Sequence, residues 1–178
     1  MRLILASTSP RRKELLTLLG VRFDIVAPPF VEQVAPNRSA EQQAVEFAVG
    51  KAKSCIELFP DALILGSDTL ISLGSEVLGK PADLADAESM LRRMAGQMHK
   101  IFTAVALAGS GTESCEVQVA EVSVTMKPLN EEALAAYLRT GDSLGKAGAY
   151  SIQGGGAALI ERIEGDYTAA VGLPLRMV

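Results

Sequence analysis

The sequence contains no tryptophan, few aromatic residues of any kind and no excess of positive charge. Aromatic residues make up 4% of the chain, so it offers no stacking platform for single-stranded nucleic acid. Its 17 Lys and Arg against 21 Asp and Glu give a formal net charge of −4. This balance excludes a general electrostatic footprint for a nucleic acid polymer, and any anion-binding cluster must be local.

Cysteine and histidine, two common metal ligands, are also scarce. The two cysteines, Cys55 and Cys115, lie far apart and form no metal-spaced pair, so we expect free thiols in a reducing compartment. His99 is the only histidine, and its neighbours do not resemble the turn that presents a catalytic serine. We therefore expect His99 to be structural, which excludes a Ser-His-Asp triad.

The N-terminus lacks a long hydrophobic run. Met1 and Arg2 lead directly into an apolar stretch that is too short for a signal-peptide core or a membrane span. We expect a soluble cytoplasmic protein that does not contact membranes. The 178 residues fit one domain, 1–178, which buries about 70% of its unfolded surface without a disulfide or zinc staple.

The apolar pattern predicts alternating strands and helices along the chain. Strands are predicted over 3–6, 21–30, 62–73, 76–80, 100–109 and 116–126, and another after the glycine-rich loop. Helices are predicted after the N-caps Ser9, Ser39 and Asp83, the second over 40–58, and again over 130–139. This order predicts a mixed α/β fold with helices on both faces of the sheet.

The segment "STSPRR" places two arginines at the start of a helix. A helix N-terminus already carries about half a positive charge, so arginine is favoured there only beside something negative. Free amides after the Ser9 cap, together with Ser7, Arg11 and Arg12, would suit phosphate oxygens. The alternative is a pair of solvated arginines that contact Glu14 or another acid, worth about 0–1 kcal/mol. Spacing alone favours neither interpretation.

Asp68 lies in the middle of the apolar segment "LILGSDTLI". A buried carboxylate needs a cation, a metal or donors beside it, which favours a general base or metal ligand over a strand-edge or bulge residue. Glu32 follows the kinked segment "APPF" and is a candidate to join Asp68 at a divalent cation. Lys51 and Lys80 are candidates to neutralise phosphate, although each alone also fits a solvated lysine.

A glycine-rich stretch follows Gln153. Glycines permit close backbone approach to a ligand, and a glutamine amide can read the edge of a base. A plain loop explains this stretch equally well. The sequence has neither a P-loop pattern nor a dinucleotide-binding glycine fingerprint.

Taken together, these segments resemble the Maf-like nucleoside triphosphate pyrophosphatases, first described as septum-formation inhibitors. The resemblance covers Leu3 to Leu175 and rests on motifs that occur in the family's order: "LILASTSPRRKELL", "GSDTLI", "EVLGKPAD", "TAVAL", "KAGAYSIQGGGA" and "VGLPL". It implies a mixed, elongated β-sheet flanked by helices, with two lobes and a cleft, related to the inosine triphosphate pyrophosphatases.

The resemblance also implies roles for individual residues. Asp68 aligns with the family's proton acceptor, and Glu32 with Asp68 would hold a divalent cation, magnesium or manganese. The residues implied to line the cleft are Ser7, Arg11, Arg12, Glu32, Lys51, Lys80 and Gln153. The family tends to form homodimers, and its substrates are nucleoside triphosphates.

The resemblance is greatest to the branch that hydrolyses dTTP and UTP to the monophosphate and pyrophosphate. A sister branch that prefers 7-methyl-GTP usually has tryptophan in place of Arg11, glutamine in place of Thr69 and glutamate in place of Gln153. All three positions favour the dTTP/UTP branch and a house-cleaning or pool-control role in nucleotide metabolism.

The chain departs from the family pattern at three places. Gly145 replaces the usual aspartate before Lys146, which would reduce activity if that acid orients the lysine or holds metal. Gly50 replaces a larger polar residue before Lys51, and we expect it to loosen that helix. Relatives usually continue through a further helix beyond the segment that ends at Val178, so we expect looser packing and lower stability there.

Two alternatives to a dTTP/UTP pyrophosphatase stay open at this point. One is a nucleotide-binding regulator of cell division with little turnover, which the Gly145 departure favours. The other is a 7-methyl-GTP pyrophosphatase, which Arg11, Thr69 and Gln153 disfavour.

Overall fold

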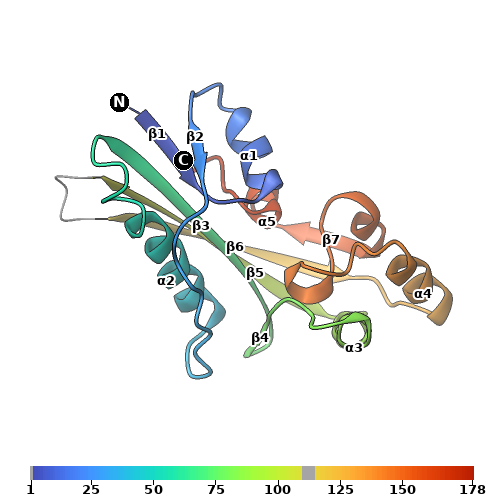
Figure 1. Cartoon of the computed structure of the whole chain (residues 1–178). Helices are drawn as coiled ribbons and strands as arrows, with labels where there is room; N and C mark the ends of the chain where they lie inside the picture. The colour runs from blue at the N-terminus through green and yellow to red at the C-terminus, as the bar shows by residue number, and fades with distance from the viewer. Residues whose placement is uncertain (1, 110–114) are drawn as a thin grey trace.

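The computed structural model describes residues 2–109 and 115–178, and its framework is a seven-stranded mixed sheet (Figure 1). The strands are β1 (Arg2–Ala6), β2 (Asp24–Val26), β3 (Ala62–Leu73), β4 (Glu76–Leu78), β5 (Met98–Gly109), β6 (Glu116–Met126) and β7 (Ile160–Glu164). The order across the sheet is β2-β1-β3-β5-β6-β7, and β4 pairs with β3. β1 runs parallel to β2 and β3, whereas the other pairs are antiparallel, so the prediction of a mixed sheet is confirmed.

The helices begin where the sequence predicts N-caps. The helices are α1 (Pro10–Thr17), α2 (Ala40–Lys53), α3 (Leu84–Met94), α4 (Glu131–Arg139) and α5 (Tyr167–Val171), with 3₁₀ turns η1 (Ala147–Ala149) and η2 (Gly154–Leu159). The side chains of Ser9, Ser39 and Asp83 each accept a hydrogen bond from a first-turn amide, and Ser39 with Gln42 forms a capping box. These bonds satisfy amides that the helix itself leaves unpaired.

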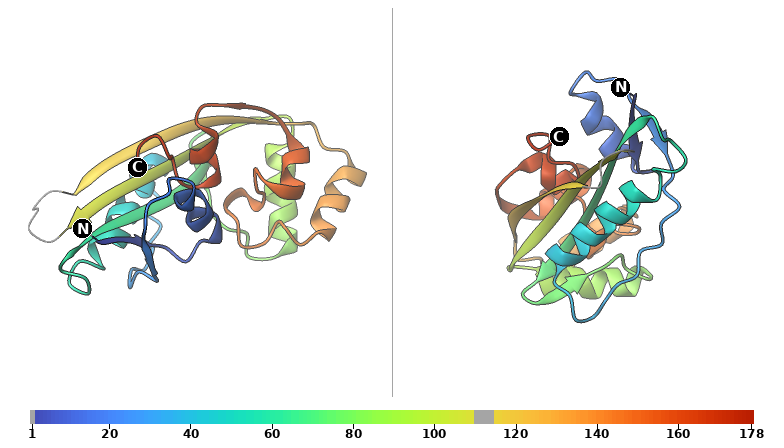
Figure 2. Two further views of the ribbon diagram at one scale, coloured as in Figure 1. Left: turned by 90° about the horizontal axis from the view of Figure 1, so that it is seen from above. Right: turned by 90° about the vertical axis from the view of Figure 1, so that its left-hand side faces the viewer.

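Three long strands, β3, β5 and β6, run through the length of the molecule and carry helices on both faces (Figure 2). α2 covers one face of β3 and β5, and α5 lies on the opposite face. α3 and α4 lie at the end of the sheet that is distant from the two chain termini (Figure 1). The sheet therefore joins two lobes.

The buried side chains form separate clusters in these lobes. Strand alternation directs Ile4 and Ile64 toward Phe47 of α2, and directs Leu5 and Leu65 toward Leu16 of α1. A further cluster gathers apolar residues of α3, α4, η1 and the far ends of β3, β5 and β6. The lobes thus have their own cores, which leaves space for a cleft between them.

Three predicted elements are shorter than expected, and one of them, the strand predicted over 76–80, is β4 and ends at Leu78. The strand predicted over 21–30 is only β2, because Pro28 and Pro29 lack amides for a ladder. The helix predicted over 40–58 ends at Lys53, after which the Ser54 hydroxyl donates to the Lys51 carbonyl at 3.0 Å. Such a local side-chain bond competes with continued helix. In the described ranges, no helix is both long and apolar enough to span a membrane.

Candidate active site

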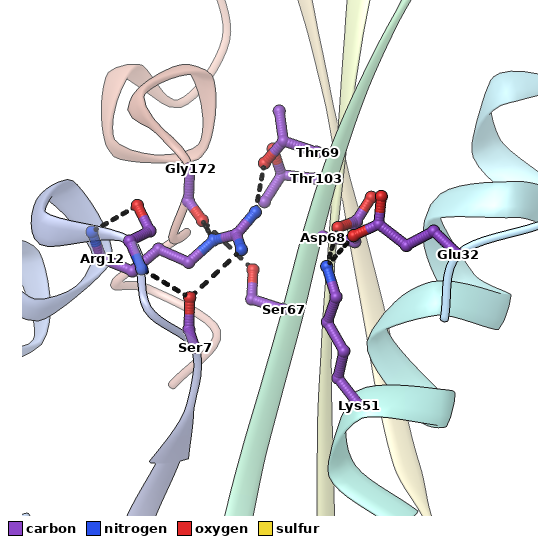
Figure 3. Close-up of polar contacts among 10 residues, drawn as sticks. Ser7, Arg12, Glu32, Lys51, Ser67, Asp68, Thr69, Thr103 and Gly172 are labelled. Atoms are coloured by element: carbon purple, nitrogen blue, oxygen red, sulfur yellow. Dashed lines mark hydrogen bonds and ion pairs between the residues drawn. The ribbon is translucent and has the colours of Figure 1, made fainter. Parts of the chain in front are cut away.

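The centre of β3 presents Ser67, Asp68 and Thr69 alternately to the two faces of the sheet (Figure 3). Successive strand residues point to opposite faces, so Asp68 faces α2, whereas Ser67 and Thr69 face α1 and the segment after α5. One strand therefore supplies polar groups to two adjacent clusters.

The first cluster consists of Asp68, Lys51 and Glu32 (Figure 3). Lys51 Nζ donates to Asp68 Oδ1 and lies 2.6 Å from Glu32 Oε1. The Lys51 and Asp68 side chains are 10% and 8% exposed, whereas that of Glu32 is 42% exposed. One ammonium thus lies between a buried carboxylate and a carboxylate that faces solvent.

Gly66 lets α2 approach β3 closely enough for Lys51 to reach Asp68. A Cβ at Gly66 would lie 2.2 Å from the Ala48 carbonyl oxygen and 2.8 Å from the Ala52 amide nitrogen. These two residues flank Lys51 on α2, and Gly66 shares the Asp68 face of β3 because it lies two residues earlier. A larger residue at this position would push the helix away from the carboxylate.

Gly50 makes room for the loop that carries Glu32. A Cβ at this position would lie 2.2–2.7 Å from three ring carbons of Phe30. The Phe30 ring also packs against Phe47, with ring centroids 6.2 Å apart. The sequence predicts that Gly50 loosens α2, but the space beside Gly50 is filled by the ring of Phe30, two residues before Glu32.

The two carboxylates differ in protonation behaviour. Burial raises the pKa of Asp68, and the Glu32 charge adds to this, although Lys51 and Arg12 oppose it. Partial burial also disfavours ionised Glu32, but its hydrogen bond to Lys51 and the charges of Lys51, Lys80 and Arg12 outweigh burial and lower its pKa. Burial thus dominates at Asp68, whereas the nearby cations together outweigh burial at Glu32.

The second cluster surrounds Arg12 (Figure 3). Its Nε donates to the Gly172 carbonyl at 3.0 Å, and its terminal nitrogens donate to Thr69 Oγ1 at 3.3 Å and to Ser7 Oγ at 3.4 Å. Ser67 Oγ also donates to the Gly172 carbonyl, at 3.1 Å. Burial lowers the pKa of the guanidinium, which nevertheless keeps its charge beside Asp68.

Arg11 reaches a different partner. Its Nη1 donates to Ser151 Oγ at 2.9 Å, across 140 positions of sequence. Within the described part of the chain, neither Arg11 nor Arg12 pairs with Glu14, so the sequence alternative of a simple surface ion pair is wrong. Both arginines instead donate hydrogen bonds to neutral oxygens at the start of α1.

A cavity of about 780 Å³ brings the predicted residues together. It is lined from both lobes, and its walls include Ser7, Arg11, Arg12, Glu32, Lys51, Asp68, Thr69 and Lys80. Gln153 is exposed and lies just beyond Ile152, a residue of the cavity wall. Another cavity, of about 570 Å³, is mainly apolar and contains none of the predicted residues.

The structure adds Lys146, Tyr150 and Ser151 to the cavity wall. Their segment, "KAGAYSIQGGGA", is recognisable in the sequence, which by itself assigns no role to Tyr150 or Ser151. Lys146 Nζ donates to the Asp142 carbonyl at 2.7 Å and lies 3.4 Å from Asp142 Oδ1. Asp142 therefore supplies an acid to this lysine from four residues earlier, where Gly145 has none.

The donor set fits a divalent cation that is shared with a phosphorylated ligand. Glu32 and Asp68 both contact Lys51 Nζ, so their carboxylates lie close together. Among the described residues, no group of three or more His, Cys, Asp or Glu side chains forms a complete metal cage. Magnesium commonly binds through one or two carboxylates plus substrate phosphates, so two convergent carboxylates suffice for that type of site.

Comparison with known proteins gives matches over nearly the full chain. The family model described as "Maf-like protein" matches residues 2–178. The dTTP/UTP pyrophosphatase of Symbiobacterium thermophilum is 47% identical over 174 residues, which cover 97% of this chain and 88% of that protein. The protein of the same name from Bacillus velezensis is 42% identical, with 98% and 91% covered, and that from Salmonella typhimurium is 47% identical, with 97% and 87% covered.

Proposed function

This chain belongs to the Maf-like protein family, and we propose on that premise that it is a nucleoside triphosphate pyrophosphatase acting on dTTP and UTP. The observation that carries the proposal is the cavity in which Asp68 lies beside a buried lysine and a half-buried arginine, in a chain 40–47% identical to enzymes of that name. Binding a triphosphate requires positively charged groups, and its hydrolysis requires a general base. Both are present in this cavity.

Asp68 is the proposed general base. It would accept a proton from water as the water oxygen attacks the α-phosphorus of the nucleotide. The bond between the α-phosphorus and the α,β-bridging oxygen then breaks, which releases the nucleoside monophosphate and pyrophosphate. The raised pKa of Asp68 supports this role, because a base works best when its pKa lies nearer the working pH.

The cationic side chains would bind the phosphates and stabilise the charge that develops on them. We assign this role to Arg11, Arg12, Lys51 and Lys80, with Ser7 donating a hydrogen bond from the turn before α1. Substrate phosphates would compete with Glu32 and Asp68 for the Lys51 ammonium. Fixed positive groups aimed at developing charge commonly make the largest contribution to catalysis of this kind.

Glu32 and Asp68 are the residues that would hold the divalent cation, magnesium or manganese. When bound, such an ion neutralises phosphate charge and polarises phosphoryl oxygens. The Lys51 charge acts to lower the pKa of both carboxyl groups, which favours their ionised, cation-binding forms.

Base selection is assigned to Arg11, Thr69 and Gln153. Thr69 Oγ1 is fixed by Arg12 and lies 3.0 Å from Thr103 Oγ1, so its orientation is set before a nucleotide enters. Gln153 is exposed and follows Ile152 of the cavity wall, and its side-chain amide is assigned to contact with the pyrimidine. Loss of one base-reading hydrogen bond would cost about 1–3 kcal/mol, or about tenfold to a hundredfold in selectivity.

The proposal also includes a homodimer in the cytoplasm. Its role would be to clear non-standard nucleotides or to limit pyrimidine triphosphate pools. Sedimentation of the purified protein tests the oligomeric state independently of activity.

The experiment that tests the function is a substrate panel. The purified protein is incubated with magnesium or manganese and dTTP, UTP, CTP, 7-methyl-GTP or inosine triphosphate, and pyrophosphate release is measured. We expect dTTP and UTP to be preferred by at least about tenfold. Preference for 7-methyl-GTP would assign the chain to the sister activity, and nucleotide binding without release would favour a regulator.

A further inference from the structure

His99 is buried on the side of the sheet that faces the segment containing Tyr150 and Ser151 of the cavity wall. It is 1% exposed and lies on β5, two residues before Ile101, which lines the cavity. Residues two apart on a strand share a face, so the imidazole points toward the same layer as Ile101. A buried polar ring of this kind is costly unless it forms a hydrogen bond.

Tyr150 supplies that bond. Its hydroxyl lies 2.6 Å from His99 Nε2, and the two rings meet edge to face with centroids 5.4 Å apart. Among the described residues, His99 Nδ1 has no hydrogen-bond partner, so the phenol provides the only described hydrogen bond of the imidazole ring. Burial lowers the pKa of His99 to about 4 and raises that of Tyr150, so both rings are neutral at pH 7.

The backbone around Tyr150 adopts a conformation that requires support. Gly148 and Ala149 both have left-handed φ angles, of 67° and 60°. Glycine accepts this readily, but alanine does not, because its Cβ crowds the following carbonyl. A non-glycine residue persists there only where the surroundings fix it.

The same backbone connects three parts of the cavity. The Gly148 amide donates to the Gly79 carbonyl at 3.0 Å, which ties the segment to the loop that carries Lys80. Ser151, next to Tyr150, accepts the hydrogen bond of Arg11. The backbone N–H of Gln153 donates to Ser151 Oγ at 3.3 Å. A shift of Tyr150 would therefore disturb the contacts around Arg11, Lys80 and Gln153, to which phosphate binding or base selection is assigned.

We propose that His99 is a positioning residue of this active site, which fixes the Tyr150 ring and thereby holds Ser151 against Arg11. The proposal rests on the proposed function for its kinetic consequences but not for its structural ones. His99 does not line the cavity and does not act on substrate. Because the bond joins two neutral groups, it orients the segment without adding charge near the phosphates.

The test uses the variants Tyr150→Phe, His99→Leu and the double variant, with His99→Gln as the conservative replacement that can return a polar group near Nε2. Tyr167→Phe is the control, because it removes the hydroxyl of an exposed tyrosine on α5. Amide hydrogen exchange over residues 146–153 is measured without ligand, and steady-state kinetics are measured with dTTP.

We expect faster exchange in this segment and a rise in KM of about tenfold for Tyr150→Phe, with kcat reduced by less than about threefold. The double variant should be no worse than the worse single variant, because the two changes remove one interaction. His99→Gln should recover most of the wild-type exchange protection and KM. The Tyr167→Phe control should match wild type throughout.

The proposal is wrong if folded Tyr150→Phe protein keeps wild-type exchange and KM, or if the effects of the two single changes multiply in the double variant. If His99→Leu does not fold, Tyr150→Phe and His99→Gln still decide. If the wild-type protein releases no pyrophosphate, the proposed function fails, and the exchange measurements alone decide whether His99 positions the segment.

Discussion

Lys51 contacts two carboxylates that differ in burial and in the direction of their pKa shifts. The ammonium bonds to buried Asp68 and to the more exposed Glu32. Burial raises the pKa of Asp68, and the negative charge of Glu32 raises it further. Glu32 thus tunes the proposed base as well as being a proposed metal ligand.

Neutralising Glu32 should move the acid limb of the pH–rate profile to lower pH. A general base must be ionised, so activity falls as pH falls through the Asp68 pKa. In Glu32→Gln, Asp68 loses a neighbouring negative charge and keeps Lys51, so its pKa falls. The kcat should also drop by about tenfold to a hundredfold, since a charge-assisted contact is lost.

The measurement is the pH dependence of kcat for dTTP at saturating metal. Glu14→Gln makes the same chemical change on an exposed glutamate of α1 and should leave the profile unchanged. An acid limb that stays in place, or moves to higher pH, would contradict the assignment of that limb to Asp68.

At the scale of elements, the site depends on how closely α2 lies against β3 and on how the Glu32 loop packs against α2. Gly66 allows the first contact and Gly50 the second. Glycine within a helix costs about 1 kcal/mol relative to alanine. At Gly50 the chain accepts this cost and gains space for Phe30, which holds the loop that carries Glu32.

Gly50→Ala should therefore fail to stabilise the protein and should reduce activity. The new methyl group would meet the Phe30 ring, and overpacking of this kind costs about 1–3 kcal/mol, which offsets the gain in helix propensity. We expect kcat/KM for dTTP to fall by about tenfold as the Glu32 loop moves. Thermal unfolding and steady-state kinetics measure the two effects.

Phe30→Leu provides the matched background for this test. With the ring removed, Gly50→Ala should become neutral or stabilising, since only the propensity gain remains. Destabilisation by Gly50→Ala of similar size in both backgrounds would show that Phe30 is not the reason for the glycine.

Local signals predicted most elements, because caps and apolar periodicity lie within a few residues. Ser9, Ser39 and Asp83 identified the starts of α1, α2 and α3. The ends of β2 and α2 differ from the prediction because they depend on features that periodicity does not encode. β2 ends before Pro28 and Pro29, which have no amide N–H for a strand ladder. α2 ends before Ser54, whose hydroxyl donates to the Lys51 carbonyl.

At the scale of the whole molecule, the cavity joins residues from both lobes. Strand composition pointed to Asp68, and the helix start pointed to Arg11 and Arg12, so most of the charged residues of the cavity wall could be predicted. The partners of these groups could not be predicted from spacing. The Ser151–Arg11 bond spans 140 positions and the His99–Tyr150 bond spans 51, and only the assembled sheet brings them together.

The most direct test of the proposed reaction is the rate of pyrophosphate release from dTTP by Asp68→Asn, measured beside wild type and Asp61→Asn. Asp61 is an exposed aspartate just before β3, outside the cavity wall. Loss of a general base should lower kcat by about a hundredfold to ten-thousandfold in Asp68→Asn, while Asp61→Asn retains wild-type turnover. Wild-type turnover by folded Asp68→Asn protein would contradict the assignment of Asp68 as the base.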